Sequence, residues 1–172
     1  MKRSILLIFL FSFFFFSCEE EIVEGCMDST ACNYDASATD DDGSCNYPLE
    51  SILEITYSED YLTGLINETM TSNIHLRNSS CESVSIQARR LVNQGVVEDF
   101  SAYFCFAGFC FDESVLVSPI TLLLGSYEVD DYFTSYFTSP SEGVFDVRYR
   151  FYLEDDPSIY IDKILTYEIT SS

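Results

Sequence analysis

The sequence predicts an all-β fold, an antiparallel β-sandwich, and two observations carry this prediction. Short segments in which apolar and polar residues alternate fill the chain from about residue 50 to residue 170. Clusters of Gly, Pro, Asn, Asp and Ser, which are typical of turns, separate these segments. No stretch of this region shows the apolar spacing of an amphipathic helix. We therefore expect a sandwich of about seven to nine short strands.

The predicted strands follow this alternation along the chain. The clearest lies at 145–153, where every second residue from Phe145 to Leu153 is apolar or aromatic. The last strand is expected at 159–169. The other predicted strands are 52–57, 73–77, 84–89, 98–106, 114–117, 120–124 and 128–137. Most aromatic rings fall on the inward phase and are expected to form the core.

The N-terminal segment has the features of an export signal. Two basic residues precede an apolar run at 5–16, which is shorter than the roughly 20 residues that span a bilayer. Cys18 follows directly after Ser17. This arrangement resembles the bacterial lipoprotein signal, although Phe15 stands where Leu is usual. The resemblance implies a signal peptide at 1–17 and lipidation of Cys18, so that the lipid bilayer is a partner.

Three glutamates follow Cys18 and begin an acidic tether at 18–24. A triple-acid run after a lipidated cysteine resembles the export signal of surface-displayed lipoproteins in some Gram-negative lineages. A solvated spacer that holds the folded part away from lipid headgroups is the alternative. We therefore expect a lipid anchor in the outer membrane and display toward the cell exterior.

The composition excludes one class of partner. The chain has 8 basic and 29 acidic residues, a formal net charge of −21. Removal of the signal leaves six basic residues against the same 29 acids, a charge of −23. Such a surface repels nucleic acid, which we do not expect as a partner. Aromatic residues make up 16% of the chain, which favours a packed core over disorder.

The cysteine count is consistent with the lipoprotein interpretation. The chain has seven cysteines, and an odd number is unusual for an exported protein. If Cys18 carries lipid, six remain for disulfides. The alternative use of cysteines, a cytosolic zinc site, is disfavoured by the export signal, the single histidine and the absence of a CxxC pair.

The segment Gly25–Tyr47 is a separate module within the predicted domain 25–49. It contains no Lys or Arg and few large apolar residues, so it requires disulfides to fold. Its sequence resembles a Cys-rich repeat of secreted and surface bacterial proteins, with the pattern G-C-x-D-x-x-A-x-N-Y-x-x-x-A-x-x-D-D-G-S-C-x-Y. It departs from this pattern at Met27 and Ala36. The resemblance supplies no biochemical role.

The module is rich in aspartates, and Ca²⁺ prefers such oxygen ligands. The candidate ligands are Asp28, Asp35, Asp40 and Asp42. The spacing is not that of an EF-hand, because the first ligand position holds Ala38. The alternative is a turn at Asp42 with the other acids in solvent. No cofactor is required by any motif, and calcium is the one candidate.

The stretch Tyr103–Phe111 lies at the centre of the predicted sandwich domain and contains the pattern Y-F-C-x4-C-F. Cys105 and Cys110 flank Gly108 and can close a tight loop. The pattern resembles an immunoglobulin-like sandwich domain of bacterial surface and secreted proteins over about residues 50–170. Phe106 stands where Trp is usual in that domain. We assign 50–172 to this domain.

Three disulfide arrangements remain open. The first joins Cys105 to Cys110 within the tight loop, Cys26 to Cys45 at the two ends of the module, and Cys32 to Cys81. The second leaves Cys32 and Cys81 as free thiols. The third pairs Cys26 with Cys32 and Cys45 with Cys81.

The function expected from these features is that of a non-enzymatic surface lipoprotein whose sandwich is an interaction or structural domain. The single histidine, His75, cannot supply a blue-copper site, and no serine occupies a strand-turn-helix elbow. The alternative is a glycan-binding accessory lipoprotein. Tyr152 and Tyr160 fall on outward phases of their strands and are the candidate ligand-binding residues. The partner is then a surface protein or a glycan.

Overall fold

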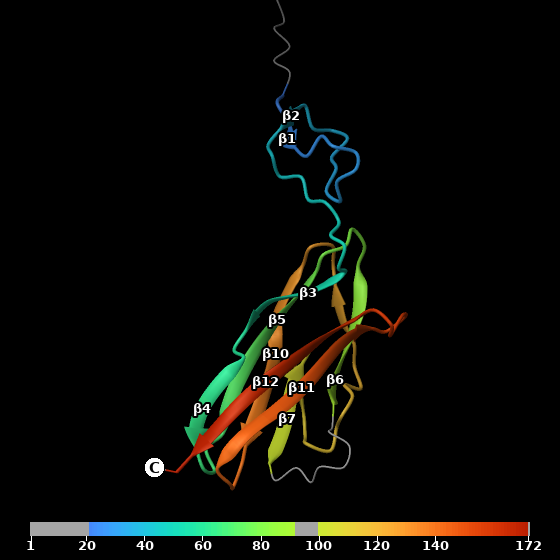
Figure 1. Cartoon of the computed structure of the whole chain (residues 1–172). Coiled ribbons are helices and arrows are strands. Elements are labelled where there is room, and N and C mark those ends of the chain that lie inside the picture. Colours follow the sequence, from blue (N-terminus) through green and yellow to red (C-terminus); the bar gives the residue numbers. More distant parts are fainter. Residues whose placement is uncertain (1–20, 92–99, 172) are drawn as a thin grey trace, which may run out of the picture.

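Two five-stranded sheets form the larger part of the molecule, and the Cys-rich module lies at one end of them (Figure 1). The structure is a computed structural model that describes residues 21–91 and 100–171. The predicted signal peptide and Cys18 lie outside the described residues. Within the described residues, no helix is long and apolar enough to cross a membrane.

The two sheets confirm the predicted fold class, an all-β sandwich. The first sheet has the order β3 (Leu53–Ser58), β5 (Met70–Asn78), β10 (Val129–Thr138), β7 (Ser101–Phe106) and β8 (Phe109–Phe111). The second has the order β4 (Tyr61–Leu65), β12 (Tyr160–Thr170), β11 (Gly143–Leu153), β6 (Val84–Leu91) and β9 (Leu122–Leu124). The module contributes only β1 (Glu24–Gly25) and β2 (Asp40–Asp41).

The strand order is that of an immunoglobulin-like sandwich. If β3 is counted as strand A, the strands B to G are β5, β6, β7, β10, β11 and β12 in chain order. One sheet then contains A-B-E-D and the other contains C-F-G. The sandwich pairs are antiparallel except β4–β12, which is parallel. The chain therefore changes sheet between β3 and β4, and β4 closes the edge beside the last strand.

The observed strands of the sandwich differ from the predicted ones at β4, at β8 and at residues 114–117. Strands β4 and β8 were not expected, because they are short and β4 alternates weakly around Gly64. The predicted strand at 114–117 does not form, and only an isolated bridge joins Val117 to Arg89. Residues 98 and 99 of another predicted strand lie outside the described residues.

Aromatic side chains fill the space between the sheets. Phe133 from β10 meets Phe151 from β11 edge to face, with ring centroids 4.8 Å apart. Phe137 and Tyr167 stack at 4.3 Å. All four side chains are fully buried. The predicted inward phase of these rings is therefore confirmed, and the polar phase of each strand faces outward.

The buried tyrosine hydroxyls are hydrogen-bonded within this core. The Ser135 hydroxyl lies 2.9 Å from the Tyr149 hydroxyl, and the Tyr167 hydroxyl donates to Ser135 Oγ at 3.0 Å. Burial raises the pKa of Tyr167. One small side chain, Ser135, thus gives both of the largest buried polar rings a hydrogen-bond partner.

Candidate functional site

Three disulfides hold the described part of the chain, and they form the first of the three predicted arrangements. The structure joins Cys26 to Cys45, Cys32 to Cys81, and Cys105 to Cys110. The Cys105–Cys110 bridge closes the β7–β8 hairpin, where Ala107 and Gly108 both have positive φ, as a tight two-residue turn requires.

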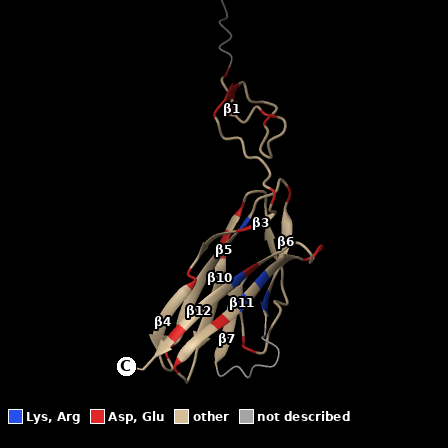
Figure 2. Cartoon of the chain, viewed as in Figure 1, with Lys and Arg blue, Asp and Glu red and all other residues tan. Residues whose placement is uncertain are grey.

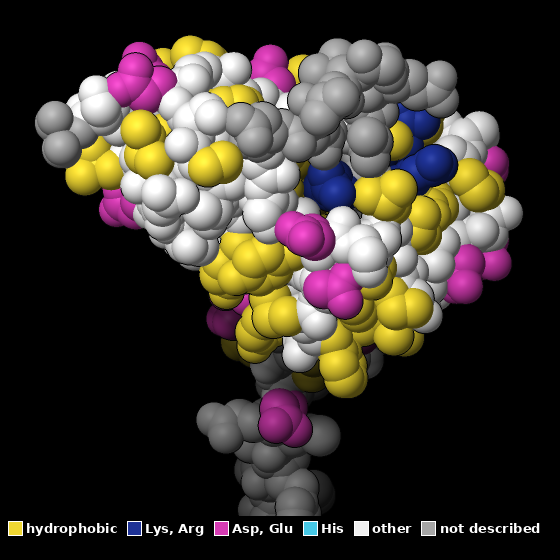
Figure 3. All heavy atoms as spheres, turned by 90° about the horizontal axis from the view of Figure 1, so that it is seen from below, with side chains coloured by type: hydrophobic (Ala, Val, Ile, Leu, Met, Phe, Trp, Pro, Cys, Tyr) yellow, Lys and Arg dark blue, Asp and Glu magenta, His cyan; other side chains and the backbone are white. Residues whose placement is uncertain are grey.

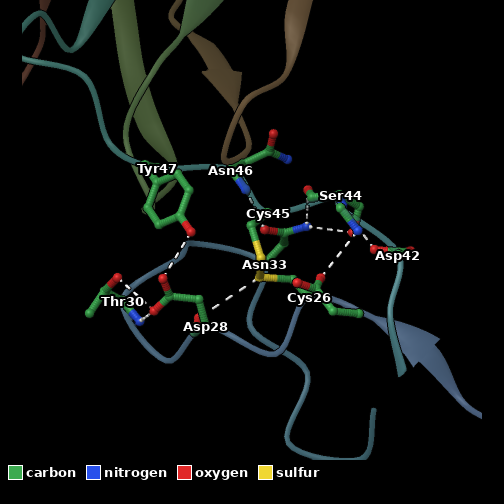
Figure 4. The surroundings of a disulfide bond; sticks show 11 residues. Cys26, Asp28, Thr30, Asn33, Asp42, Ser44, Cys45, Asn46 and Tyr47 are labelled. Atoms are coloured by element: carbon green, nitrogen blue, oxygen red, sulfur yellow. Dashed lines mark hydrogen bonds between the residues drawn. A yellow bond between two sulfur atoms is a disulfide. The ribbon is translucent and has the colours of Figure 1, made fainter. Parts of the chain in front are cut away.

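The module is held by its disulfides and not by a hydrophobic core. Among residues 21–49, only Cys26 and Ala31 are buried apolar residues. Figure 4 shows the Cys26–Cys45 bridge surrounded by polar side chains. The second bridge, Cys32–Cys81, connects the module to the sandwich, and the backbone N–H of Leu49 donates to Ser79 O at 3.1 Å close by. The module is therefore both folded and attached by covalent bonds.

The candidate calcium ligands are engaged in local turns. Asp28 accepts hydrogen bonds from Thr30 and from the Tyr47 hydroxyl, each at 2.8 Å (Figure 4). Hydrogen bonds from the Thr30 backbone and side chain lower the pKa of Asp28. Asp35 and Asp42 accept in the same way from the serine two residues further on, which lowers the pKa of each carboxyl.

These carboxylates do not gather at one point. Among the described residues, no group of three or more His, Cys, Asp or Glu side chains could hold a metal ion. Asp28, Asp35 and Asp42 each order their own turn, and Asp40 lies in the short strand β2. Calcium binding by the module stays a prediction.

Tyr152 and Tyr160 lie side by side on the outer face of the second sheet. They are direct cross-strand partners on β11 and β12. The side chain of Tyr160 is exposed, and the Tyr152 hydroxyl donates to Gln87 Oε1 at 2.9 Å. The guanidinium carbon of Arg150 lies 3.7 Å from the centre of the Tyr160 ring. One face of Tyr160 is therefore covered by a cation, as in a cation–π contact.

An unpredicted cluster of arginines adjoins these tyrosines. We call the outward side chains of Arg89 on β6 and of Arg148 and Arg150 on β11 the arginine face. Arg89 and Arg150 are direct cross-strand partners, and Arg148 lies two residues before Arg150 on the same side of β11. Basic segments lie on these central strands in Figure 2, and basic side chains gather in one area of the surface in Figure 3.

Only one arginine of this face is neutralised by a partner. Arg150 donates two hydrogen bonds to Asp162, at 2.7 and 2.8 Å, and these raise the pKa of Arg150. Within the described residues, the side chains of Arg89 and Arg148 form no hydrogen bond or ion pair. The alternation of residues 145–153 predicts that Arg148 and Arg150 point outward. That Arg89 lies beside Arg150 depends on the register of β6 against β11, which the alternation does not give.

The outer face of the first sheet has a second aromatic pair that the sequence did not single out. Tyr103 on β7 and Tyr136 on β10 stack in parallel with ring centroids 4.6 Å apart. A shallow pocket of about 390 Å³ adjoins Tyr103 and is bordered by Phe111 and Glu113. Outward tyrosines are therefore found on both sheets.

Comparison with known proteins adds likenesses of fold. No protein-family model matches the chain, and no curated protein matches it. The PapD-like domain 7 of human CEP192 is 15% identical, with a TM-score of 0.43, covering 75% of this chain and 92% of that domain. The CARDB domain of the PF1109 protein from Pyrococcus furiosus, solved with di-metal ions, is 18% identical, with a TM-score of 0.39, covering 77% of this chain and all of that domain.

A family 123 glycoside hydrolase from Clostridium perfringens is 6% identical, with a TM-score of 0.44. The match covers 71% of this chain but only 28% of the hydrolase. These three likenesses are weak, so the fold class rests on the sheets of this chain. The molecule is an all-β, disulfide-bonded protein with an immunoglobulin-like sandwich as its main domain.

Proposed function

We propose that this protein is a lipid-anchored, non-enzymatic surface protein that presents its sandwich as an interaction domain. The pairing of the cysteines carries this proposal. Six of the seven cysteines pair with one another in three disulfides, so Cys18 has no cysteine of this chain left as a partner. A lone cysteine directly after an export signal is the position at which a bacterial lipoprotein is acylated.

The module then acts as a spacer between the anchor and the sandwich. It follows the acidic tether and is connected to the sandwich by Cys32–Cys81. A cross-link of this kind restricts the motion of the module relative to the sandwich. The sandwich is then held away from the outer membrane and toward the cell exterior, where its two open sheet faces are available to a partner.

The test replaces Cys18 with alanine. Wild-type protein is expected in the outer-membrane fraction with acyl chains on its N-terminus, because two or three chains bury many methylenes at about 0.8 kcal/mol each. On intact cells, added protease is expected to digest it. The Cys18→Ala protein is expected to lack lipid in intact-mass analysis and to be either soluble or left with its signal peptide uncleaved. A mature wild-type N-terminus without lipid contradicts the anchor, and digestion only after lysis contradicts surface display.

A second candidate function, glycan binding, is favoured by the Tyr152–Tyr160 pair. Two neighbouring rings beside the Gln87 amide combine stacking surface with hydrogen-bonding groups on an open sheet. A sugar ring stacked on such a pair needs no deep pocket. This protein would then be an accessory lipoprotein that collects glycan for a partner machine.

The corresponding prediction is tested on a glycan array with purified mature protein. Saturable binding is expected, and Tyr152→Ala with Tyr160→Ala is expected to abolish it because both stacking surfaces are removed. Tyr61→Ala is the matched control, since Tyr61 is an exposed tyrosine of the same sheet whose hydroxyl bonds Glu168. Equal losses in the control and the double variant would argue against this site.

A further inference from the structure

Strand register places aromatic and charged side chains in adjacent rows on the outer face of the second sheet. One row contains Tyr160, Tyr152 and Gln87, and the next contains Asp162, Arg150 and Arg89. Rows of outward side chains along a strand are about 6.8 Å apart, twice the rise per residue. One extended ligand can therefore contact both rows at once.

The charge of this face is opposite to that of the chain. The whole chain carries −21, and only six basic residues follow Arg3 in the sequence. Three of these six form the arginine face, and Asp162 neutralises only one of them. Arg89 lies directly opposite Arg150 across the two strands, and Asp162 pairs with Arg150 alone. An anionic ligand beside Arg89 and Arg148 would balance the charge that the described residues leave unpaired on this face.

We infer that the arginine face and the Tyr152–Tyr160 pair together bind an acidic polysaccharide, one whose sugars carry carboxylate groups. The inference rests on the second candidate function and names its ligand class. Within the described residues, the guanidinium groups of Arg89 and Arg148 have no hydrogen-bond or ion-pair partner. A guanidinium donates two parallel hydrogen bonds to a carboxylate. The sugar ring stacks on the tyrosines in the neighbouring row.

The open shape of the face favours a polysaccharide over a compact anion. Arg89 and Arg148 are both exposed on a sheet surface, and the exposed Ile164 lies beside Arg148. An extended chain with repeated charges can use several such weak contacts in series. An acidic peptide carries the same charge but has no sugar ring to stack on the tyrosines. Poly-glutamate is therefore included in the test as a probe for this alternative ligand.

The test uses the full mature chain in detergent and three probes: polygalacturonate, neutral hydroxyethylcellulose and poly-glutamate. Polygalacturonate is expected to bind, and higher ionic strength is expected to weaken the binding by screening. The Arg89→Gln/Arg148→Gln variant is expected to raise the Kd for polygalacturonate at least about tenfold, the effect of losing one charged hydrogen bond. Its melting temperature is expected to stay near that of the wild type, because neither side chain has a partner to lose in the part of the chain that the structure describes.

The matched control is Arg77→Gln. Arg77 is an outward arginine of the first sheet that pairs with Glu54, and its replacement is expected to leave the Kd unchanged. Wild-type affinity in the double variant, or equal affinity for poly-glutamate, would overturn the inference. Binding of the neutral polymer alone would overturn it while leaving glycan binding standing. Failure of wild-type protein to bind either polysaccharide would overturn both.

Discussion

Replacement of Phe133 by alanine is expected to lower the free energy of unfolding by about 3–5 kcal/mol, the usual effect of removing a buried phenylalanine ring. Phe133 is fully buried at the centre of the sandwich. Its ring contacts Phe104 on the neighbouring strand and Tyr149 and Phe151 on the opposite sheet. The surrounding rings belong to both sheets and cannot all move to fill the cavity. Urea unfolding with intact disulfides measures the change as a shift of the midpoint.

The control for this prediction is Phe109→Ala. Phe109 lies in the edge strand β8 and is 62% exposed, so the same substitution removes a ring that is mostly in water. We expect a change within about 0.5 kcal/mol. Typical domains are stable by about 5–15 kcal/mol, so the core variant would lose a large share. Similar midpoints for the two variants would show that Phe133 does not occupy the core in the folded protein.

The alternation of apolar and polar residues that predicted the strand at 145–153 shows how far the sequence determines this fold. Strand β11 alternates over its whole length because one side faces the core and the other faces water. Strand β4 could not be found in this way. It lies at an edge, and its parallel partner β12 is distant in the sequence, so the pairing depends on tertiary contacts that no local pattern encodes.

The alternation within single strands also predicted part of the candidate site, the outward tyrosines, but not the arginine face. Periodicity places Tyr152 and Tyr160 outward, and both lie on the outer face. The arginine face could not be recognised as a cluster, because Arg89 and Arg150 are 61 positions apart and only the register of β6 against β11 makes them neighbours. A charge pattern across strands requires the register, and the register follows from the whole sheet.

Removal of the Cys26–Cys45 bridge is expected to unfold the module while the sandwich stays folded. The bridge closes a loop with a sequence separation of 19, which is worth roughly 3 kcal/mol in the chain-entropy model. The module has almost no buried apolar surface to offset that loss, because only Cys26 and Ala31 are buried there among residues 21–49. The core of the sandwich consists of other residues entirely. The Cys26→Ser/Cys45→Ser variant is therefore expected to lose amide-exchange protection in 25–47 and to keep it in β10 and β11.

The matched control is Cys105→Ser/Cys110→Ser, which removes a bridge from a hairpin whose strands are already paired within the first sheet. That bridge spans only 5 positions, so the unfolded chain gains little freedom when it is lost. We expect exchange in the module to stay at the wild-type level there. Limited proteolysis provides an independent measurement, with cleavage of the first variant confined to 25–47. Retained protection of the module without the Cys26–Cys45 bridge would mean that the turns of Asp28, Asp35 and Asp42 hold the module together. A second exchange measurement with added calcium would then show whether those carboxylates bind an ion.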